Sequence, residues 1–287
     1  MHMVRMPTKK LNRSFTVSFL LFLLLLLFGA FMALPLIYTV NNAFKPLDEL
    51  FIFPPRFLVA NPTMDNFYDL LALMGNSWVP LSRYIFNTLL ITIVGTAGHI
   101  LLASAAAFPL AKYKFPGSKI LFSIVVLSLM FSSHVTAIPN YMVMSWVGWV
   151  NTHASIIVPS LAFPLGLFLM KQFMEQIPDA ILEAAKIDGA SEYKIFWSIV
   201  MPNVKPAWLT LMILQFPKLW GTDGGSFIYS ENLKTLHYAL GQISQGGIAR
   251  AGVGAAVALL LMIVPIILFI ISQSSVMQTM ATSGMKD

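Results

Sequence analysis

The sequence contains no cysteine, and only 10% of its 287 residues are charged. Without thiols the chain has no disulfide framework, no thiolate metal site and no thiol nucleophile. It also lacks the Gly-x-x-x-x-Gly-Lys-Ser/Thr loop that cradles ATP phosphates and the His-Glu-x-x-His pattern of zinc proteases. We therefore expect no catalytic residue, no metal site and no directly bound cofactor.

Apolar residues, by contrast, make up 57% of the chain, and its mean hydropathy is +0.76. These values lie outside the range of soluble globular domains and indicate an all-α integral membrane protein. Six apolar stretches each approach the ~20 residues needed to cross ~30 Å of hydrocarbon. The six predicted transmembrane helices are about 15–40, 84–110, 120–143, 155–173, 204–220 and 252–276.

The basic residues indicate how these spans are oriented. With the N-terminus in the cytoplasm, 12 of the 18 Lys and Arg residues fall in cytoplasmic segments and 6 in external ones. Cytoplasmic segments usually carry such an excess. The sequence therefore predicts cytoplasmic ends (1–14 and 277–287), a transmembrane domain (15–276) and external loops (41–82 and 221–250). Because the charges are scattered rather than clustered, nucleic acid is not expected as a partner.

Spans two and six are rich in small residues, which allow helix backbones to approach closely in lipid. We expect these two spans inside the bundle or at a subunit interface, and the leucine-rich span one outside it. The small residues are Gly95, Gly98, Ala103, Ser104, Ala105, Ala106 and Ala107 in span two, and Gly252, Gly254, Ala255, Ala256 and Ala258 in span six.

A polar segment, residues 175–202, separates spans four and five. Pro178 and Asp179 suit the first turn of a helix, because proline needs no N–H donor there and an acid favours the positive helix end. Gly189 predicts a helix stop, and Ser191 can cap a second helix. The first helix presents a small apolar face made of Ala180, Ala184 and Ile187. Such a helical hairpin fits a cleft on a partner better than it fits a protein core.

This segment resembles the EAA loop of the membrane subunits of ATP-binding-cassette importers, and especially the carbohydrate (maltose-type) branch of type I importers. The matching residues are Glu183, Ala184, Ala185, Gly189, Ile199 and Pro202, with Met201 in place of the usual leucine. In that family the loop forms a coupling helix that docks on the ATPase. The resemblance assigns ATPase docking to Glu183, Ala184, Ala185, Lys186, Asp188 and Gly189.

The resemblance implies a permease subunit, without its own ATP-hydrolysing motif, that imports an oligosaccharide across the bacterial cytoplasmic membrane. The implied partners are a second permease subunit, two ATPase subunits that use ATP and Mg, an external solute-binding protein and membrane lipid. Two alternatives remain open. One is a permease for another solute, such as a polyamine or phosphate, and the other is an ATP-independent channel or membrane enzyme. Glu183 could also merely solvate its helix and pair with Lys186.

Polar and aromatic side chains along the spans are candidates for the substrate path. They could line a hydrophilic cavity, or they could bond to neighbouring helices and anchor the spans at the membrane interface. The candidates are Asn87, Thr92, His99, Ser132, Trp208 and Gln215.

The external loop 221–250 is rich in glycine and polar residues, which predicts a flexible segment. In maltose-type importers the corresponding loop reaches into the solute-binding protein. The resemblance assigns this contact to Tyr229, Asn232, Gln242 and Gln245, with an ordinary external loop as the alternative. The tail after Val276 resembles the family's C-terminal tail, which can contact the ATPases.

Overall fold

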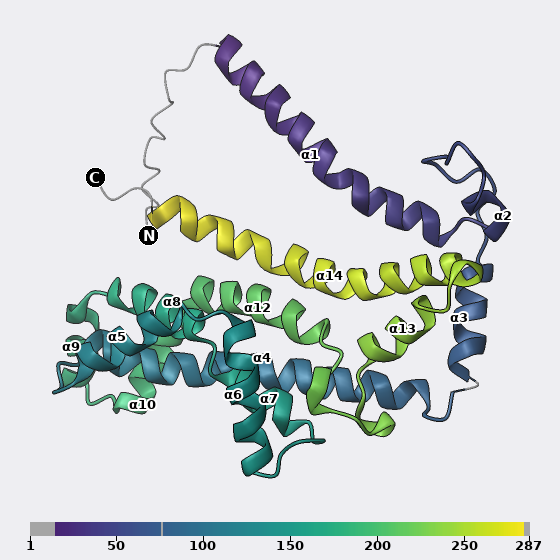
Figure 1. Cartoon of the computed structure of the whole chain (residues 1–287). Helices are drawn as coiled ribbons and strands as arrows, with labels where there is room; N and C mark the ends of the chain where they lie inside the picture. Colours follow the sequence, from purple (N-terminus) through teal and green to yellow (C-terminus); the bar gives the residue numbers. More distant parts are fainter. Residues whose placement is uncertain (1–14, 76, 284–287) are drawn as a thin grey trace.

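The computed structural model describes residues 15–75 and 77–283, and every regular element in that part of the chain is helical (Figure 1). This agrees with the predicted all-α fold class; the predicted segment 1–14 lies outside the described residues. The longer helices are α1 (Phe15–Ala43), α3 (Asp65–Gly75), α4 (Leu81–Lys112), α5 (Ser118–Ser128), α6 (Ser133–Trp146), α7 (Ala154–Leu161), α8 (Pro164–Glu175), α9 (Asp179–Ile187), α12 (Lys205–Trp220), α13 (Leu236–Ser244) and α14 (Ala251–Ser283).

Short helical turns connect these helices. They are α2 (Leu47–Leu50), α10 (Glu192–Ile195), the π-helical turn η1 (Phe196–Val200), α11 (Met201–Asn203) and the 3-10 turns η2 (Gly225–Phe227), η3 (Glu231–Leu233) and η4 (Ile248–Arg250).

Helix α4 packs at the centre of the bundle because its small residues let neighbouring helices approach. A Cβ added at Gly95 would lie 2.6 Å from Leu219 on α12, and one at Gly98 would lie 2.8 Å from Leu161 on α7. In lipid, close backbone packing of this kind holds helices together. The buried share of the most apolar stretch is 39% in α4 and 0% in α1. These values confirm that span two lies inside the bundle and span one outside it.

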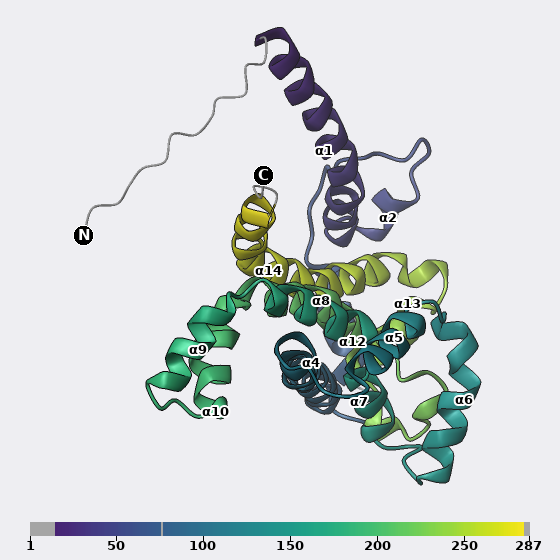
Figure 2. The same ribbon diagram turned by 90° about the vertical axis from the view of Figure 1, so that its left-hand side faces the viewer.

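Helix α1 stands apart from the bundle for most of its length and joins it at its C-terminal end (Figures 1 and 2). There the buried Asn66 amide of α3 donates to the carbonyls of Ala43 at 3.0 Å and Lys45 at 2.7 Å. This satisfies acceptors that the end of a helix leaves free. Gly252 of α14 makes room for the junction, since a Cβ there would lie 2.1 Å from Asn66 Oδ1.

Four helical stretches of the described chain are long and apolar enough to cross a membrane: Phe15–Ala43, Leu81–Lys112, Ala154–Glu175 and Ala251–Gln273. Predicted span three is not a continuous helix, because α5 ends at Ser128 and Ser132 caps a new helix, α6, by accepting from the His134 N–H. Predicted span five corresponds to α12, whose 16 residues extend only about 24 Å. Helix length and composition therefore support four of the six predicted spans directly.

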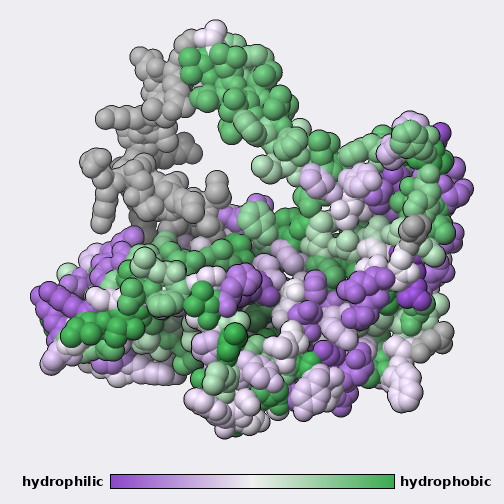
Figure 3. All heavy atoms as spheres, viewed as in Figure 1, coloured by the Kyte–Doolittle hydropathy of each residue, from purple (hydrophilic) through white to green (hydrophobic). Residues whose placement is uncertain are grey.

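Two apolar clusters hold the ends of the bundle together. One includes Met174, Leu182 and Val200 near α9, and the other includes Leu70 and Leu240 where α3 and α13 meet. Hydrophilic residues gather on the surface near α9 and around α2 and α3, whereas α1 is hydrophobic along its length (Figure 3). The molecule therefore has two polar ends joined by apolar helices.

Candidate functional site

The polar segment between α8 and α12 folds into a helical hairpin, residues 178–195, which projects from the bundle (Figure 2). Gly189 ends the first helix with φ +78°, a conformation that carries no Cβ penalty only in glycine. Ser191 Oγ accepts from the Lys194 N–H at 3.3 Å and so caps α10. The predicted order of helix, glycine turn and second helix agrees with the structure.

Helix α9 packs on the bundle through one side only. Leu182 is 7% exposed and belongs to the same apolar cluster as Ile195 and Val200. The opposite side carries the predicted apolar face, and no part of the described chain covers it: Ile187 is 86% exposed, and Ala180 and Ala184 are also exposed. Apolar side chains gathered on an exposed helix face indicate a contact with another molecule.

The C-terminal end of α4 holds the 178–195 hairpin at two points. Lys112 Nζ forms an ion pair with Asp179 Oδ1 at 2.8 Å, and this hydrogen bond lowers the pKa of the Asp179 carboxyl. Near the turn, the Tyr113 hydroxyl donates to Glu192, and Lys186 Nζ lies 2.7 Å from Glu192 Oε1. The bond from Lys186, followed by the one from Tyr113, lowers the pKa of Glu192. The base and the tip of the hairpin are thus both tied to one helix.

The side chains of Glu183 and Asp188 form no hydrogen bond or ion pair with any residue that the structure describes. Lys186 pairs with Glu192, so the alternative that Glu183 pairs with Lys186 is wrong. The separation follows from the hairpin, whose turn brings Glu192 of α10 back against α9. Glu183 and Asp188 remain available to a partner. A protruding helix with an open apolar face and unpaired carboxylates can dock on a protein.

Four of the six side chains predicted for the substrate path are buried within the subunit. Asn87, Thr92, His99 and Gln215 are at most 1% exposed. Ser132 is exposed at the start of α6, and the half-buried Trp208 donates from its indole N–H to the Met201 carbonyl. The structure does not bring the six together, and the substrate path remains a prediction.

Two of these buried side chains bind backbone carbonyls at the break between α7 and α8, which lies in the fourth predicted span. Pro164 has no N–H, so the carbonyl of Ser160 at the end of α7 loses its helical donor. Gln215 Nε2 of α12 donates to this carbonyl at 2.9 Å, and His99 Nδ1 of α4 lies 2.9 Å from the next carbonyl, that of Leu161. Free backbone groups at membrane depth need such partners. His99 therefore bonds to a neighbouring helix. This was the alternative to lining a hydrophilic cavity.

Part of the glycine-rich loop 221–250 has regular structure, although its composition predicted a flexible segment. Residues 236–244 form helix α13, because Thr235 caps it and Ala239, Leu240 and Ile243 pack into an apolar cluster. Asn151, at φ +61°, accepts from the N–H groups of Tyr229 and Ser230 at 3.2 and 2.9 Å. Asn87 Nδ2 donates to the carbonyls of Asn232 and Lys234 at 2.9 and 2.8 Å. The backbone is therefore fixed, although the side chains of Tyr229, Asn232, Gln242 and Gln245 are exposed.

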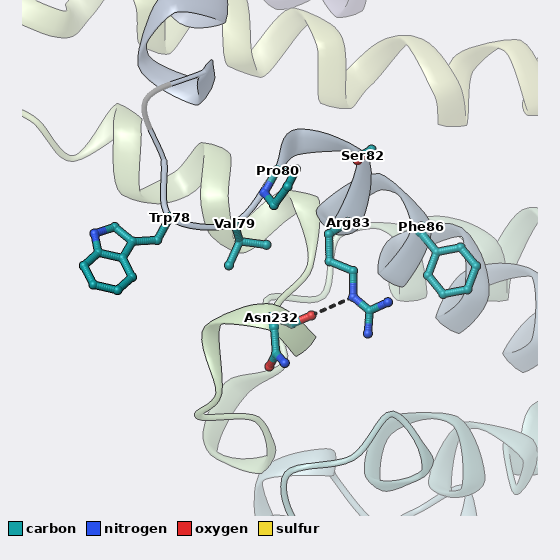
Figure 4. A pocket seen from close by; sticks show the side chains of 7 residues that line it. All are labelled: Trp78, Val79, Pro80, Ser82, Arg83, Phe86 and Asn232. Atoms are coloured by element: carbon teal, nitrogen blue, oxygen red, sulfur yellow. Dashed lines mark hydrogen bonds between the residues drawn. The ribbon is translucent and has the colours of Figure 1, made fainter.

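A groove of about 580 Å³ opens beside this loop at the N-terminal end of α4. Trp78 and Phe86 stand at its two ends, with Arg83 between them (Figure 4). Arg83 Nε donates to the Asn232 carbonyl at 3.1 Å, and its guanidinium carbon lies 5.7 Å from the centre of the Phe86 ring. The groove thus combines two aromatic rings, a guanidinium and an amide.

The sequence alone did not predict that Lys112, Tyr113 and Glu192 support the hairpin. It also did not predict that Trp78 and Arg83 line the groove. Lys112 and Tyr113 directly follow the predicted span two. In the sequence, a basic residue at this place indicates only the cytoplasmic flank of a span. Their pairing with residues 67 to 79 positions later depends on the fold, and no local spacing indicates it. The predicted C-terminal tail begins inside α14, which continues to Ser283.

Comparison with known proteins gives concordant matches. The family described as "Binding-protein-dependent transport system inner membrane component" matches residues 99–279. The chain is 31% identical over 239 residues to Protein LplC of Bacillus subtilis, covering 78% of this chain and 73% of that protein. It is 31% identical over 200 residues to the arabinooligosaccharides transport system permease protein AraQ of Halalkalibacterium halodurans, covering 67% and 69%.

Among solved structures, the fold is similar to a chain from a bacterial ABC transporter involved in the import of the acidic polysaccharide alginate. The TM-score is 0.75 with 20% sequence identity, over 93% of this chain and 99% of that one. At this identity the likeness concerns the fold.

Proposed function

Because this chain belongs to the family of binding-protein-dependent transport system inner membrane components, we propose that it is a permease subunit that imports an oligosaccharide across the bacterial cytoplasmic membrane. The observation that carries the proposal is the exposed apolar face of the 178–195 hairpin, which has the shape and chemistry of a docking element. Hydrolysis of ATP, with Mg, belongs to a separate ATPase. The chain contributes coupling and the route through the membrane.

We place the hairpin and both termini in the cytoplasm, with six spans: α1, α4, α5 with α6, α7 with α8, α12 and α14. The excess of Lys and Arg in the segments assigned to the cytoplasm supports this orientation. The groove, α3 and α13 then lie on the external side. The partners are a second permease subunit, two ATPase subunits and an external solute-binding protein.

In this mechanism the ATPases bias the permease through differential contacts with the hairpin. A ligand shifts a conformational equilibrium only as far as it binds the two states differently, so the contacts on Ile187, Glu183 and Asp188 must change during the cycle. The ties from Lys112 and Tyr113 make the hairpin move together with α4.

Two observations support an oligosaccharide as the solute. One of the relatives described above carries arabinooligosaccharides in its name, and the structure of similar fold belongs to an importer of a polysaccharide. The external groove adds aromatic rings, which suit the C–H-rich faces of sugar rings, and the Arg83 guanidinium, which can bind a carboxylate with two parallel hydrogen bonds. A polyamine would meet an unfavourable charge at Arg83.

The proposal is tested with the reconstituted transporter by comparing Ile187→Asp with Ser198→Asp. Both positions are exposed on the segment between α8 and α12. Ser198 lies in η1, after the hairpin, and is not part of the apolar face of α9. We expect Ile187→Asp to lose copurification of the ATPase, or to lose stimulation of ATP hydrolysis by the loaded binding protein, while Ser198→Asp retains both. Equal behaviour of the two variants would reject docking through this face.

A further inference from the structure

The loop between α2 and α3 exposes a run of large apolar side chains. Phe53 is 92% exposed, Leu58 64% and Phe51 53%, and Ile52 and Phe57 are also exposed. Figure 3 shows hydrophobic surface on this loop, beside the hydrophilic residues of α2. A contiguous apolar run on a loop is costly in water and indicates a contact with another apolar phase.

The backbone of the loop is held in place by two buried charged side chains. The Glu49 carboxylate accepts from the N–H groups of Ala60 at 2.7 Å and Asn61 at 3.2 Å. Lys45 Nζ donates to the Arg56 carbonyl at 2.5 Å. Lys45 and Glu49 are only 2% and 4% exposed. Because these bonds occupy the inner side of the loop, its apolar side chains are directed outward.

The loop lies beside the end of α1 rather than beyond it. The Val59 N–H donates to Asn41 Oδ1 at 3.1 Å, and the rings of Phe57 and Tyr38 are 5.7 Å apart. Tyr38 precedes the end of α1 at Ala43 by five residues, which places Phe57 about 7–8 Å back along the helix. Figures 1 and 2 both show the loop folded back along α1.

From this geometry we propose that residues 51–58 insert into the outer leaflet of the membrane as an interfacial anchor. The adjoining α1 is an apolar span whose most apolar stretch no described part of the chain buries, so lipid that borders this end of α1 also meets the loop. Phe57 thus lies level with Tyr38, inside the apolar helix rather than past its end, and apolar side chains of interfacial segments settle between headgroups and acyl chains in this way. Arg56, which is exposed within the same run, supplies a cation that suits lipid phosphates at the membrane interface.

The anchor fixes the depth of α1, whose contacts with the bundle are gathered at its C-terminal end. The assignment to the outer leaflet rests on the orientation proposed above. The contact with lipid itself does not, since it follows from the position of the loop beside a membrane span.

The absence of cysteine from this chain allows a direct test, because a single cysteine introduced into it can be labelled before assembly with the partner subunits, without background from the chain itself. We would place an environment-sensitive fluorophore at Phe53→Cys, at Leu58→Cys and, as a matched control, at the exposed Asp69→Cys on α3. The complete transporter is reconstituted in vesicles of phosphatidylethanolamine and phosphatidylglycerol that contain lipids with a spin-label quencher near the headgroup.

We expect blue-shifted emission and at least about twofold stronger quenching at Phe53→Cys and Leu58→Cys than at Asp69→Cys, because an interfacial segment lies within reach of the quencher. Emission at both loop positions that matches the control would overturn the proposal. So would a blue shift that appears only when the external binding protein is added, since the loop would then be a protein contact. ATPase stimulation, measured on the same vesicles, tests the proposed function separately from lipid contact.

Discussion

The side-chain amide of Gln215 donates to the carbonyl oxygen of Ser160 at 2.9 Å, across the interface between α12 and α7. That carbonyl is the one that Pro164 leaves without a helical donor. The bond compensates for a helix break deep in the apolar part of the chain.

Replacing Gln215 with leucine keeps the volume but removes the donor. We expect Gln215→Leu to lower the free energy of unfolding by about 1–3 kcal/mol, because a buried carbonyl loses its partner. The matched control, Gln242→Leu on the exposed side of α13, should change it by less than about 0.5 kcal/mol. Thermal unfolding in detergent measures both, and equal midpoints would show that the bond does not stabilise the break.

The close packing of His99 against α8 depends on a glycine. A Cβ at Gly166 would lie 1.9 Å from His99 Nε2, whereas a Cβ at Gly241 on α13 meets no atom within 4 Å. Gly166→Ala should therefore destabilise the protein by about 1–3 kcal/mol through overpacking. Gly241→Ala should be neutral or stabilise it by up to about 1 kcal/mol through helix propensity. The two unfolding curves should separate in opposite directions; a harmless Gly166→Ala would contradict the packing described here.

Substitutions on the two sides of α9 should have different effects on stability and on association with the ATPase. Leu182→Ala removes a buried side chain and should cost about 2–5 kcal/mol of stability. Ile187→Ala removes an exposed one and should change stability by less than about 0.5 kcal/mol, yet weaken association with the ATPase. Unfolding midpoints and copurification distinguish the two effects. If Ile187→Ala unfolded the protein as Leu182→Ala does, the face would be part of the core.

The tip of the 178–195 hairpin should open in acid. The hydrogen bond from Lys186 lowers the pKa of Glu192 below its ordinary value of 4.5 in the folded state. A lowered pKa stabilises the folded form above pH 4.5, and this contribution is lost as the pH falls through the lowered value. Measured relative to the intrinsic exchange rate at each pH, amide hydrogen exchange in residues 186–195 should accelerate below about pH 4.5.

A Glu192→Gln variant provides the control for this titration. Glutamine does not titrate, so exchange in the hairpin of this variant, relative to the intrinsic rate, should lack the acid-dependent rise and should be faster at neutral pH. Substitution of Glu183, which has no partner in the described chain, should leave the profile unchanged. A rise of equal size in Glu192→Gln would assign the acid transition to another group.

The elements governed by local chemistry could be predicted from the sequence. Gly189 and Ser191 determine the turn of the hairpin by their own backbone and side-chain preferences, and the small residues of span two predicted the central helix. Pro164 is a local signal for a helix break, but it lies within a long apolar stretch that predicted one continuous span. The glycines of loop 221–250 suggested flexibility, but the contacts from Asn87 and Asn151 that fix it come from distant parts of the chain.

The contacts of α4 have a mechanical consequence. Its first turns hold η3 and the residue after it through Arg83 and Asn87, and its last turn holds the hairpin through Lys112. A helix of 32 residues is about 48 Å long, so a tilt of about 5° around its middle moves each end by about 2 Å. A small rotation of this one helix therefore produces equal and opposite displacements at loop 221–250 and at the hairpin.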